Sequence, residues 1–321
     1  MNYIDFHCDT LMKLFDLYKM GDHSQTIWEN QCQIDVKRLV QSGYFAQFFA
    51  CYLWWIDQPF CGSHYQDALK MTEIFLEGLH GHEEETAFAG SWKEFEKNKN
   101  DGKVSCFLTV EEGGILEGKL ERLEELYQKG IRLITLTWNF ENCIGYPSCN
   151  PQFKNKGLKK FGIEALERMD ELGIIADVSH LSDAGFYDVW ENIKRPFIAS
   201  HSNCRSLCDH NRNLTDDMIR KLAQKGGIAG INFYGQFLGK DEKSTLENIV
   251  KQIRHMMDIG GREIVGIGTD FDGVDDELEI NGCQYMYKLP MAMEKAGFTI
   301  GEIEDVCYCN AEKFLKRYWE G

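Results

Sequence analysis

The sequence predicts a single (β/α)8 barrel. Three observations support this fold class: eight short runs of β-branched and aromatic residues, helical spacing of apolar residues between them, and a length of 321 residues with no linker. Strands that alternate with helices form a parallel sheet, and eight such units in about 300 residues close into a barrel. An open doubly wound sheet is the alternative, but no GxGxxG motif follows a strand to support its dinucleotide-binding version.

The eight runs are expected to be the barrel strands, in chain order. They occupy residues 3–6, 45–53, 104–110, 133–137, 174–178, 197–199, 228–233 and 264–267. Their apolar character is typical of strands that are buried on both faces. Trp54 and Trp55, which follow the second run, are expected to belong to the core, as are Met256 and Met257.

The segments between the runs carry helical patterns. Residues 246–257 place apolar side chains at i, i+3, i+4 and i+7, which predicts a helix that ends at Gly260-Gly261. Thr215 is an expected N-cap because two acidic residues follow it, where the helix dipole favours them. A stripe over residues 165–172 ends at Gly173. Residues 275–321 are expected to close the barrel with helices within the same domain.

The charge balance excludes some classes of partner. Lys and Arg number 35 and Asp and Glu 51, so the net charge is 35 − 51 = −16, which argues against binding of nucleic acid or an anionic membrane. The acidic residues at 121, 124 and 125 are expected on a solvated helix face. The N-terminus has no leader pattern, and the apolar run over residues 44–56 is shorter than the roughly 20 residues that cross a bilayer. We therefore expect a cytoplasmic protein with reduced cysteines.

Residue types that bind metals follow five of the eight predicted strands. In a (β/α)8 barrel the active site lies at the carboxyl ends of the strands, so side chains at these positions converge. The residues are His7 and Asp9 after the first run, Glu111 and Glu112 after the third, then His180, His201 and Asp270 after the fifth, sixth and eighth. One histidine after a strand is more often structural, but five such positions together favour a site.

Histidine and carboxylate side chains together are the ligands of a hydrolytic metal centre. His7 and Asp9 are two residues apart on an extended segment, so both face the same side and can bind one ion. The whole set exceeds the ligands of one open zinc site, which predicts two metals about 3.5 Å apart with a bridging carboxylate. We assign the bridge to Glu112, because the two glycines after it leave room. Glu111 is expected to face the other side of the strand and to be structural.

These segments resemble the membrane (renal) dipeptidase family of zinc metallopeptidases, as a soluble bacterial-type member. The similar segments are DFHCDT at 5–10, EGG at 112–114, DVSH at 177–180, SHSN at 200–203, RNLTDD at 212–217, NFY at 232–234 and GTDFDG at 268–273. They occur in the order of the family and extend over nearly the whole chain, and together they are specific.

The resemblance implies a function and a role for each residue. His7 and Asp9 would bind one zinc ion, His180 and His201 the other, and Glu112 would bind both. Asp270 would be the acid and base near the bridging water. Arg212 would hold the C-terminal carboxylate of the substrate, since a guanidinium pairs with a carboxylate through two bonds. The reaction would be hydrolysis of a dipeptide, with tolerance of a D-residue at the C-terminal position, and the enzyme could be a homodimer.

One position departs from the family pattern. The family carries a histidine after the fourth strand, in LTLTH, where this sequence has Trp138. Tryptophan offers one N–H donor and cannot become cationic. Stabilisation of the developing oxyanion would then come from zinc, from Trp138, or from a neighbour such as Asn139 or Asn142. We expect an altered substrate preference or rate with the metal chemistry retained.

Two alternative functions follow from the same fold. Other binuclear barrel amidohydrolases generally open with HxH, whereas this chain has HxD, and they often use a modified lysine after the fourth strand. A non-catalytic scaffold is the second alternative, and the retention of every expected ligand and of Asp270 argues against it. The aromatic C-terminal residues Phe314, Tyr318 and Trp319 could pack at a dimer interface, but burial in the core is the preferred interpretation.

Overall fold

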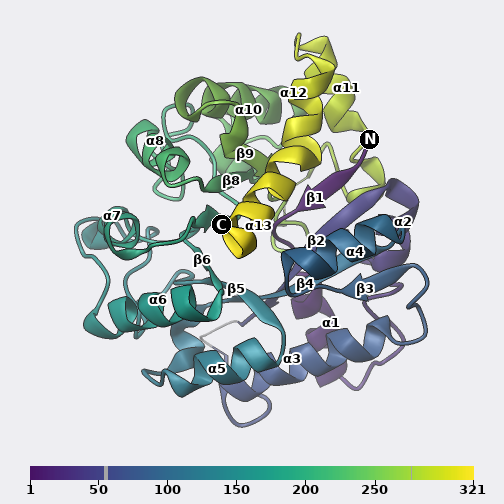
Figure 1. Cartoon of the computed structure of the whole chain (residues 1–321), viewed down its shortest axis with the longest axis vertical. Helices are drawn as coiled ribbons and strands as arrows, with labels where there is room; N and C mark the ends of the chain where they lie inside the picture. The colour runs from purple at the N-terminus through teal and green to yellow at the C-terminus, as the bar shows by residue number, and fades with distance from the viewer. Residues whose placement is uncertain (54–56, 276) are drawn as a thin grey trace.

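The chain forms a closed parallel β-barrel surrounded by helices (Figure 1). The structure is a computed structural model that describes residues 1–53, 57–275 and 277–321. The strands follow one another in the order β2-β1-β9-β8-β7-β6-β5-β4, and the pairing of β2 with β4 closes the ring. The predicted fold class is therefore confirmed. Trp54 and Trp55 lie outside the described residues.

The strands and helices have the following bounds. The strands are β1 (Tyr3–Asp5), β2 (Tyr44–Tyr52), β3 (Thr86–Phe88), β4 (Val104–Glu111), β5 (Ile131–Thr135), β6 (Ile175–Asp177), β7 (Ile198–Ala199), β8 (Ile228–Ile231) and β9 (Val265–Ile267). The α-helices are α1 (Thr10–Lys19), α2 (Val36–Ser42), α3 (His64–Leu79), α4 (Trp92–Asn100), α5 (Glu121–Gln128), α6 (Lys160–Leu172), α7 (Asp183–Asn192), α8 (Asp216–Gln224), α9 (Gly235–Leu238), α10 (Leu246–Gly260), α11 (Lys288–Lys295), α12 (Ile300–Glu304) and α13 (Asn310–Glu320). Short 3₁₀ segments are η1 (Gly113–Leu116), η2 (Pro151–Phe153), η3 (Arg262–Ile264) and η4 (Cys283–Tyr285), and η5 (Asp305–Cys309) is a π-helix.

Each of the eight predicted runs overlaps one strand of the barrel, with ends that differ by at most two residues. The additional strand β3 was not predicted; it lies outside the closed ring and pairs with the start of β4. The predicted helix signals are also confirmed. Thr215 accepts a hydrogen bond from the backbone N–H of Met218, Gly173 ends α6 in the left-handed conformation, and α10 ends before Gly261.

The barrel interior is filled by large side chains that come from most of its strands. Phe6, Phe48 and Phe107 are the largest of them, and β5, β6, β7 and β8 each contribute one buried side chain to the same cluster. In β9 a glycine, Gly266, leaves space that the Phe6 ring occupies, since a Cβ there would lie 3.0 Å from a carbon of that ring. This end of the barrel is a packed core, so the opposite end is left for a site.

Helix α13 covers the amino-terminal end of the strands, where it lies across the centre of the view in Figure 1. Phe314 and Tyr318 are buried in the interior cluster, and the Phe314 ring meets the Phe6 ring edge-on at 6.0 Å. Phe314 and Tyr318 therefore belong to the core, as the preferred interpretation expected, and Trp319 is partly buried against it. Residues 310–320 thus close the amino-terminal end of the barrel.

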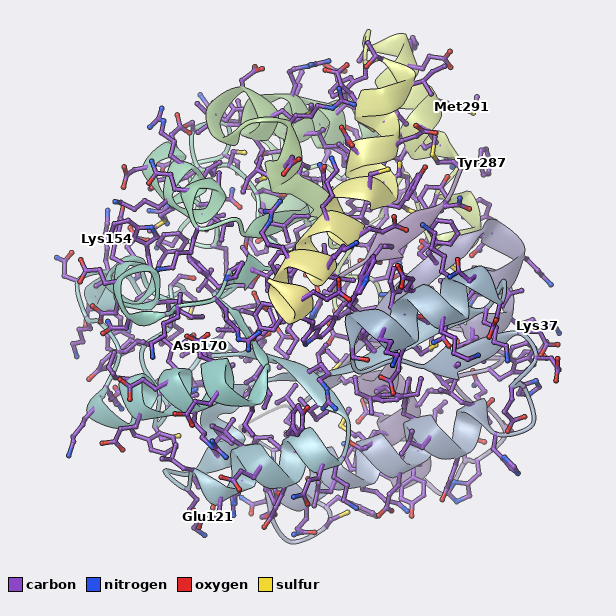
Figure 2. All side chains as sticks on the ribbon, in the orientation of Figure 1. Lys37, Glu121, Lys154, Asp170, Tyr287 and Met291 are labelled. Atoms are coloured by element: carbon purple, nitrogen blue, oxygen red, sulfur yellow. The ribbon has the colours of Figure 1, made fainter. Side chains whose placement is uncertain are left out.

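The predicted acidic helix face lies at the outer surface. Glu121 projects from the periphery in Figure 2, and Glu124 and Glu125 are exposed beside it, as the sequence predicts. The twelve cysteines are free thiols. Among the described helices, none has the length and apolar character needed to cross a bilayer.

We predict that closure by α13 contributes strongly to stability. Phe314→Ala should lower the free energy of unfolding by about 3–5 kcal/mol, because it removes a fully buried ring and leaves a cavity. Urea unfolding measures this change. Glu320→Ala, an exposed position on the same helix, should change it by less than about 0.5 kcal/mol. Equal effects of the two variants would contradict a closing role for α13.

Candidate metal centre

Strand β4 directs Glu111 into the barrel. Side chains in a strand alternate between faces, so Glu111 shares a face with Phe107, four residues earlier, which belongs to the interior cluster. Glu111 is 2% exposed and lies opposite Tyr52 of β2 and Thr135 of β5 in the sheet register. The carboxylate therefore lies inside the barrel mouth.

Glu112 does not occupy the bridging position that the sequence analysis assigned to it. Its carboxylate accepts hydrogen bonds from the backbone N–H groups of Gly114, at 2.6 Å, and Trp138, at 3.0 Å, and from the amide of Asn142. The chain leaves the strand direction at Glu112, whose φ is 103°. The prediction was wrong because it placed Glu111 on the outer face, whereas the position of Phe107 assigns it to the inner one.

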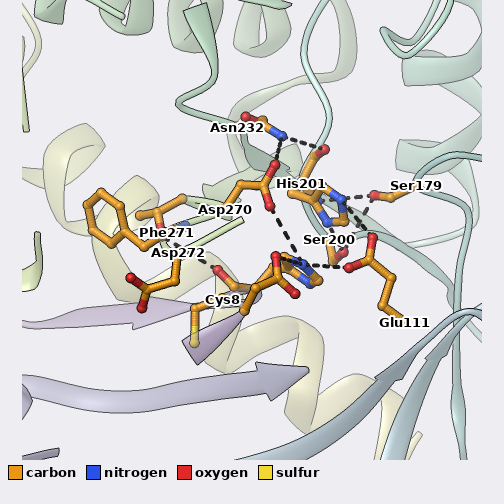
Figure 3. A network of polar contacts seen from close by, with 12 residues as sticks. Cys8, Glu111, Ser179, Ser200, His201, Asn232, Asp270, Phe271 and Asp272 are labelled. Carbon is orange, nitrogen blue, oxygen red and sulfur yellow. Dashed lines mark hydrogen bonds and ion pairs between the residues drawn. The ribbon is translucent and has the colours of Figure 1, made fainter. Parts of the chain in front are cut away.

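Two groups of possible ligands share the Glu111 carboxylate. One group is His7, Asp9 and Glu111, and the other is Glu111, His180 and His201. Glu111 Oε2 lies 3.1 Å from His7 Nε2, and Oε1 lies 3.0 Å from His180 Nε2 and 3.5 Å from His201 Nε2. In Figure 3 the carboxylates of Glu111 and Asp270 both point into the polar network that contains His201; Glu111 ends β4 and Asp270 follows β9. Each group could hold a metal ion, and Glu111 belongs to both.

The protons of His180 and His201 point away from this centre. The Nδ1–H of His180 donates to the amide oxygen of Asn139, at 3.1 Å, since that oxygen can only accept. The Nδ1–H of His201 donates to Ser200 Oγ, at 2.7 Å, because the serine gives its own proton to Asp177, at 2.6 Å. Burial and the nearby Arg212 lower the pKa of His180 to about 3, so the ring is neutral and its Nε2 carries a lone pair.

The two Nε2 lone pairs face each other at 3.0 Å, with Glu111 beside them. Burial and the neighbouring His7 also lower the pKa of His201, so neither ring supplies a proton to this contact. Three electron-rich atoms converge in a buried space, which is unfavourable unless a cation lies among them. The donor set therefore fits a metal ion, and imidazole with carboxylate suits zinc.

Asp177 orients His201 indirectly, through the hydroxyl of Ser200. Burial alone would raise its pKa, but His201 and the hydroxyls of Ser200 and Thr135 outweigh burial and lower it. The ionised carboxylate accepts from both hydroxyls at 2.6 Å and from the N–H of Ser179 at 2.9 Å. A carboxylate behind a ligating histidine fixes the tautomer of the ring, and here the serine mediates that effect.

His7 and Asp9 form the other half. Neither ring nitrogen of His7 makes a hydrogen bond within the described part of the chain, although the side chain is fully buried. Burial opposes a charge on His7, but Glu111 and Asp9 outweigh it and hold its pKa well above the usual value. Burial raises the pKa of Asp9 to about 7. His7 Nε2 lies 3.1 Å from Glu111 Oε2 and 3.4 Å from Asp9 Oδ2, so these three atoms could also hold one cation.

Asp270 lies at the rim of the same centre. One carboxylate oxygen lies 3.7 Å from His7 Nε2, and the other accepts a hydrogen bond from the amide of Asn232 at 2.8 Å. Asp270 has a φ of 61° and His180 a φ of 68°, so both hold the left-handed conformation that side chains disfavour. Such strain gathers at functional sites, where the surrounding structure maintains it.

Arg212 is a buried cation beside the carboxylates. It is 5% exposed, and its terminal nitrogens donate to Ser202 Oγ at 3.3 Å and to the carbonyl of His201 at 3.2 Å. In the parts of the chain that the structure describes, its Nε has no hydrogen-bond partner and the guanidinium forms no ion pair. Arg212 can therefore accept a carboxylate from a ligand.

The loop after β5 contributes Trp138 and Asn139. The Trp138 ring lies edge-on to Tyr52, with centroids 5.1 Å apart, and 6.1 Å from the His180 ring. Asn139 contacts His180, as described above. Asn142, which the sequence suggested as an oxyanion donor, is committed elsewhere: its amide nitrogen donates to Glu112 and to the carbonyl of Leu136.

The sequence analysis missed the residues that support the ligands. Asp177 and Asn232 lie within the quoted segments DVSH and NFY, yet neither was given a role. Ser200 directly precedes His201, and a hydroxyl next to a predicted ligand is a signal that could have indicated a supporting contact. The partner of Asn232 lies 38 positions away, and no local pattern reports such a contact.

Comparison with known proteins identifies a family. The model of the membrane dipeptidase family (Peptidase family M19) matches residues 1–318. An uncharacterized dipeptidase of Schizosaccharomyces pombe is 32% identical over 68% of this chain and 54% of its own length. An uncharacterized protein of Klebsiella pneumoniae is 28% identical over 71% of this chain and 87% of its own. The chain thus spans about half the length of the fission-yeast relatives that it matches.

Two solved structures share the fold. A metallopeptidase of Rhodobacter sphaeroides, liganded with a phosphinate mimic of the dipeptide L-Ala-D-Ala, has a TM-score of 0.88 at 24% identity over 99% of each chain. A second metallopeptidase, a dipeptidase of family M19, has a TM-score of 0.89 at 24% identity over 100% of this chain and 99% of its own. These likenesses extend over the whole barrel.

We predict that the two adjacent glutamates differ in their effect on metal content. Glu111→Gln should lose at least about half of the bound zinc, because it removes the charge that both ligand groups share. Glu112→Gln should retain the wild-type content, because its carboxylate faces backbone N–H groups. Metal analysis after dialysis measures both. Loss of zinc from the Glu112 variant alone would restore the assignment made from the sequence.

Proposed function

Because the chain belongs to the membrane dipeptidase family (Peptidase family M19), we propose that it is a zinc-dependent dipeptidase. One observation carries the proposal. Two ligand groups share Glu111, and within the described structure a buried Arg212 without an ion-pair partner lies beside them. The first feature suits a hydrolytic metal centre. The second suits a small substrate that carries a free carboxylate.

Two zinc ions are the proposed cofactors. His7 and Asp9 would hold one ion, His180 and His201 the other, and Glu111 both. When bound, the ions would supply Lewis acidity that polarises an amide carbonyl and makes water a stronger acid.

Asp270 is the proposed general base and acid. Its carboxylate is held by the Asn232 amide on one oxygen and faces the ligand cluster with the other. It would accept the proton of the attacking water at that second oxygen. The same oxygen would then give the proton to the leaving amine as the amide bond breaks, so that an amino acid with a free amine departs.

Arg212 is the proposed anchor for the C-terminal carboxylate of the substrate. Its neighbours Ser202 and the His201 carbonyl fix the guanidinium, and Asp270 and Glu111 lie near enough to interact with its charge. An anchored carboxylate limits the length of peptide beyond the scissile bond to one residue. The Rhodobacter sphaeroides enzyme, which binds a mimic of L-Ala-D-Ala, supports tolerance of a D-residue at that position.

The test combines chelation with a change in substrate charge. The zinc-loaded protein should hydrolyse L,L and L,D dipeptides, lose activity to a chelator and regain it with zinc. Arg212→Met should lower kcat/KM for free dipeptides by roughly 10- to 100-fold, because charged hydrogen bonds are lost. The same variant should lose the wild-type preference for a dipeptide over its C-terminal amide. A metal-free and inert protein would favour the scaffold function, and zinc-dependent hydrolysis of other amides alone would favour another amidohydrolase.

Trp138 is proposed to set the substrate preference. Its ring lies 5.1 Å from the Tyr52 ring and 6.1 Å from the His180 ring, measured between centroids. The indole has one N–H donor and carries no positive charge. Trp138→His should therefore raise turnover of ordinary dipeptides, because imidazole can donate to the developing oxyanion. Initial rates over a dipeptide panel measure this effect. Identical kinetics of the variant and the wild type across the panel would refute it.

A further inference from the structure

Glu112 is a buried carboxylate that the proposed reaction does not use. It is 1% exposed, and burial raises its pKa even though several donors oppose that effect. Its oxygens face the N–H groups of Gly114 and Trp138 and the amide of Asn142. One side chain at the end of β4 thus binds two positions in the loop that follows β5.

Asn142, which is bonded to Glu112, forms further hydrogen bonds with the backbone at both ends of that loop. Its amide nitrogen also donates to the carbonyl of Leu136 at 2.9 Å, and its oxygen accepts from the N–H groups of Ile144, at 2.7 Å, and Gly145, at 3.0 Å. Residues 136–145 are therefore held at both ends by one pair of side chains. The pair is buried, so these hydrogen bonds do not compete with water.

The local backbone is built to allow this contact. A Cβ at Gly114 would lie 2.5 Å from Glu112 Oε1 and 2.9 Å from Asn142 Cβ, so only glycine lets the carboxylate approach. Glu112 itself holds a φ of 103°, a conformation that a side chain rarely adopts. A strained glutamate persists where its contacts require it.

The loop that Glu112 binds also contacts a proposed zinc ligand, His180. Trp138 receives the backbone contact, and the next residue, Asn139, accepts the Nδ1–H of His180 at 3.1 Å. This hydrogen bond keeps the His180 lone pair on the nitrogen that faces Glu111. Two adjacent glutamates therefore act on His180 from opposite sides, one at Nε2 and one through the loop at Nδ1.

We propose that Glu112 is a positioning residue that clamps the loop after β5 and thereby sets Asn139 against His180. The role rests on the proposed function, because it matters for rate only if His180 serves the reaction. Partners of this kind typically change activity or metal affinity by about 10- to 100-fold when they are removed.

The experiment compares Glu112→Gln with wild-type protein, both loaded with zinc. An amide cannot accept from all of the present donors, so hydrogen exchange at residues 136–145 should accelerate by about 10-fold or more. The kcat/KM for a dipeptide should fall by about 10- to 100-fold at unchanged zinc content. Glu112→Gly, which suits the positive φ but lacks the carboxylate, should behave in the same way.

Glu117 supplies the matched control. It also has a positive φ, of 47°, and ends the same 3₁₀ turn, but its carboxylate is exposed and pairs with Arg122. Glu117→Gln and Glu117→Gly should leave exchange in the loop and kcat/KM at wild-type values. A loss shared by both positions would assign the effect to the turn rather than to the Glu112 carboxylate, and would overturn the proposal.

A double variant separates positioning from general stability. If Glu112 acts through Asn139, Glu112→Gln combined with Asn139→Ala should lose no more kcat/KM than the more severe single variant. Additive losses, or wild-type exchange in the loop of Glu112→Gln, would overturn the proposal. Should the wild-type protein hydrolyse no dipeptide, the proposed function fails, and the exchange comparison alone then decides whether Glu112 clamps the loop.

Discussion

The contact on which the site depends is between two histidine nitrogens that both lack a proton. His180 Nε2 and His201 Nε2 lie 3.0 Å apart, and Glu111 brings a third electron-rich atom to them. In a buried space such a contact is repulsive, and it persists only because the rest of the barrel holds both rings in place. A cation converts the same geometry into an attractive one, which is the physical reason to expect metal at this point.

Much of the surrounding structure serves to hold those protons away from the centre. On one side the Asp177 carboxylate accepts the Ser200 proton, so that Ser200 accepts from His201. On the other side Asn139 accepts from His180. The two supports differ in origin, since Asp177 ends strand β6 whereas Asn139 belongs to a loop that must itself be held. The clamp that we assign to Glu112 would hold Asn139 in place, as strand β6 holds Asp177.

The barrel separates stability from function along its axis. Aromatic side chains and α13 fill the amino-terminal end, where Phe6, Phe107 and Phe314 belong to one hydrophobic cluster. The carboxyl-terminal end carries buried charges, strained backbone at His180 and Asp270, and the cation Arg212. The packed core at the amino-terminal end thus supports the buried charges and the strained backbone at the other end. The net charge of −16 belongs to the whole chain, including its buried carboxylates, whereas Arg212 provides a local positive charge where a substrate carboxylate would bind.

The sequence by itself determined the eight barrel strands, the helix ends at Gly173 and Gly261, and the strand ends that carry the candidate metal ligands. These features are local, because alternation, capping and the position after a strand are read from neighbouring residues. The choice between Glu111 and Glu112 was also available from the period of the strand, had Phe107 been taken as the inner reference. Tertiary structure alone decided what Glu112 binds, which amide holds Asp270 and how Asp177 reaches His201, because those contacts join segments 23 to 38 residues apart. Their partners are set by how the strands of the barrel are placed side by side, and no short-range pattern encodes that placement.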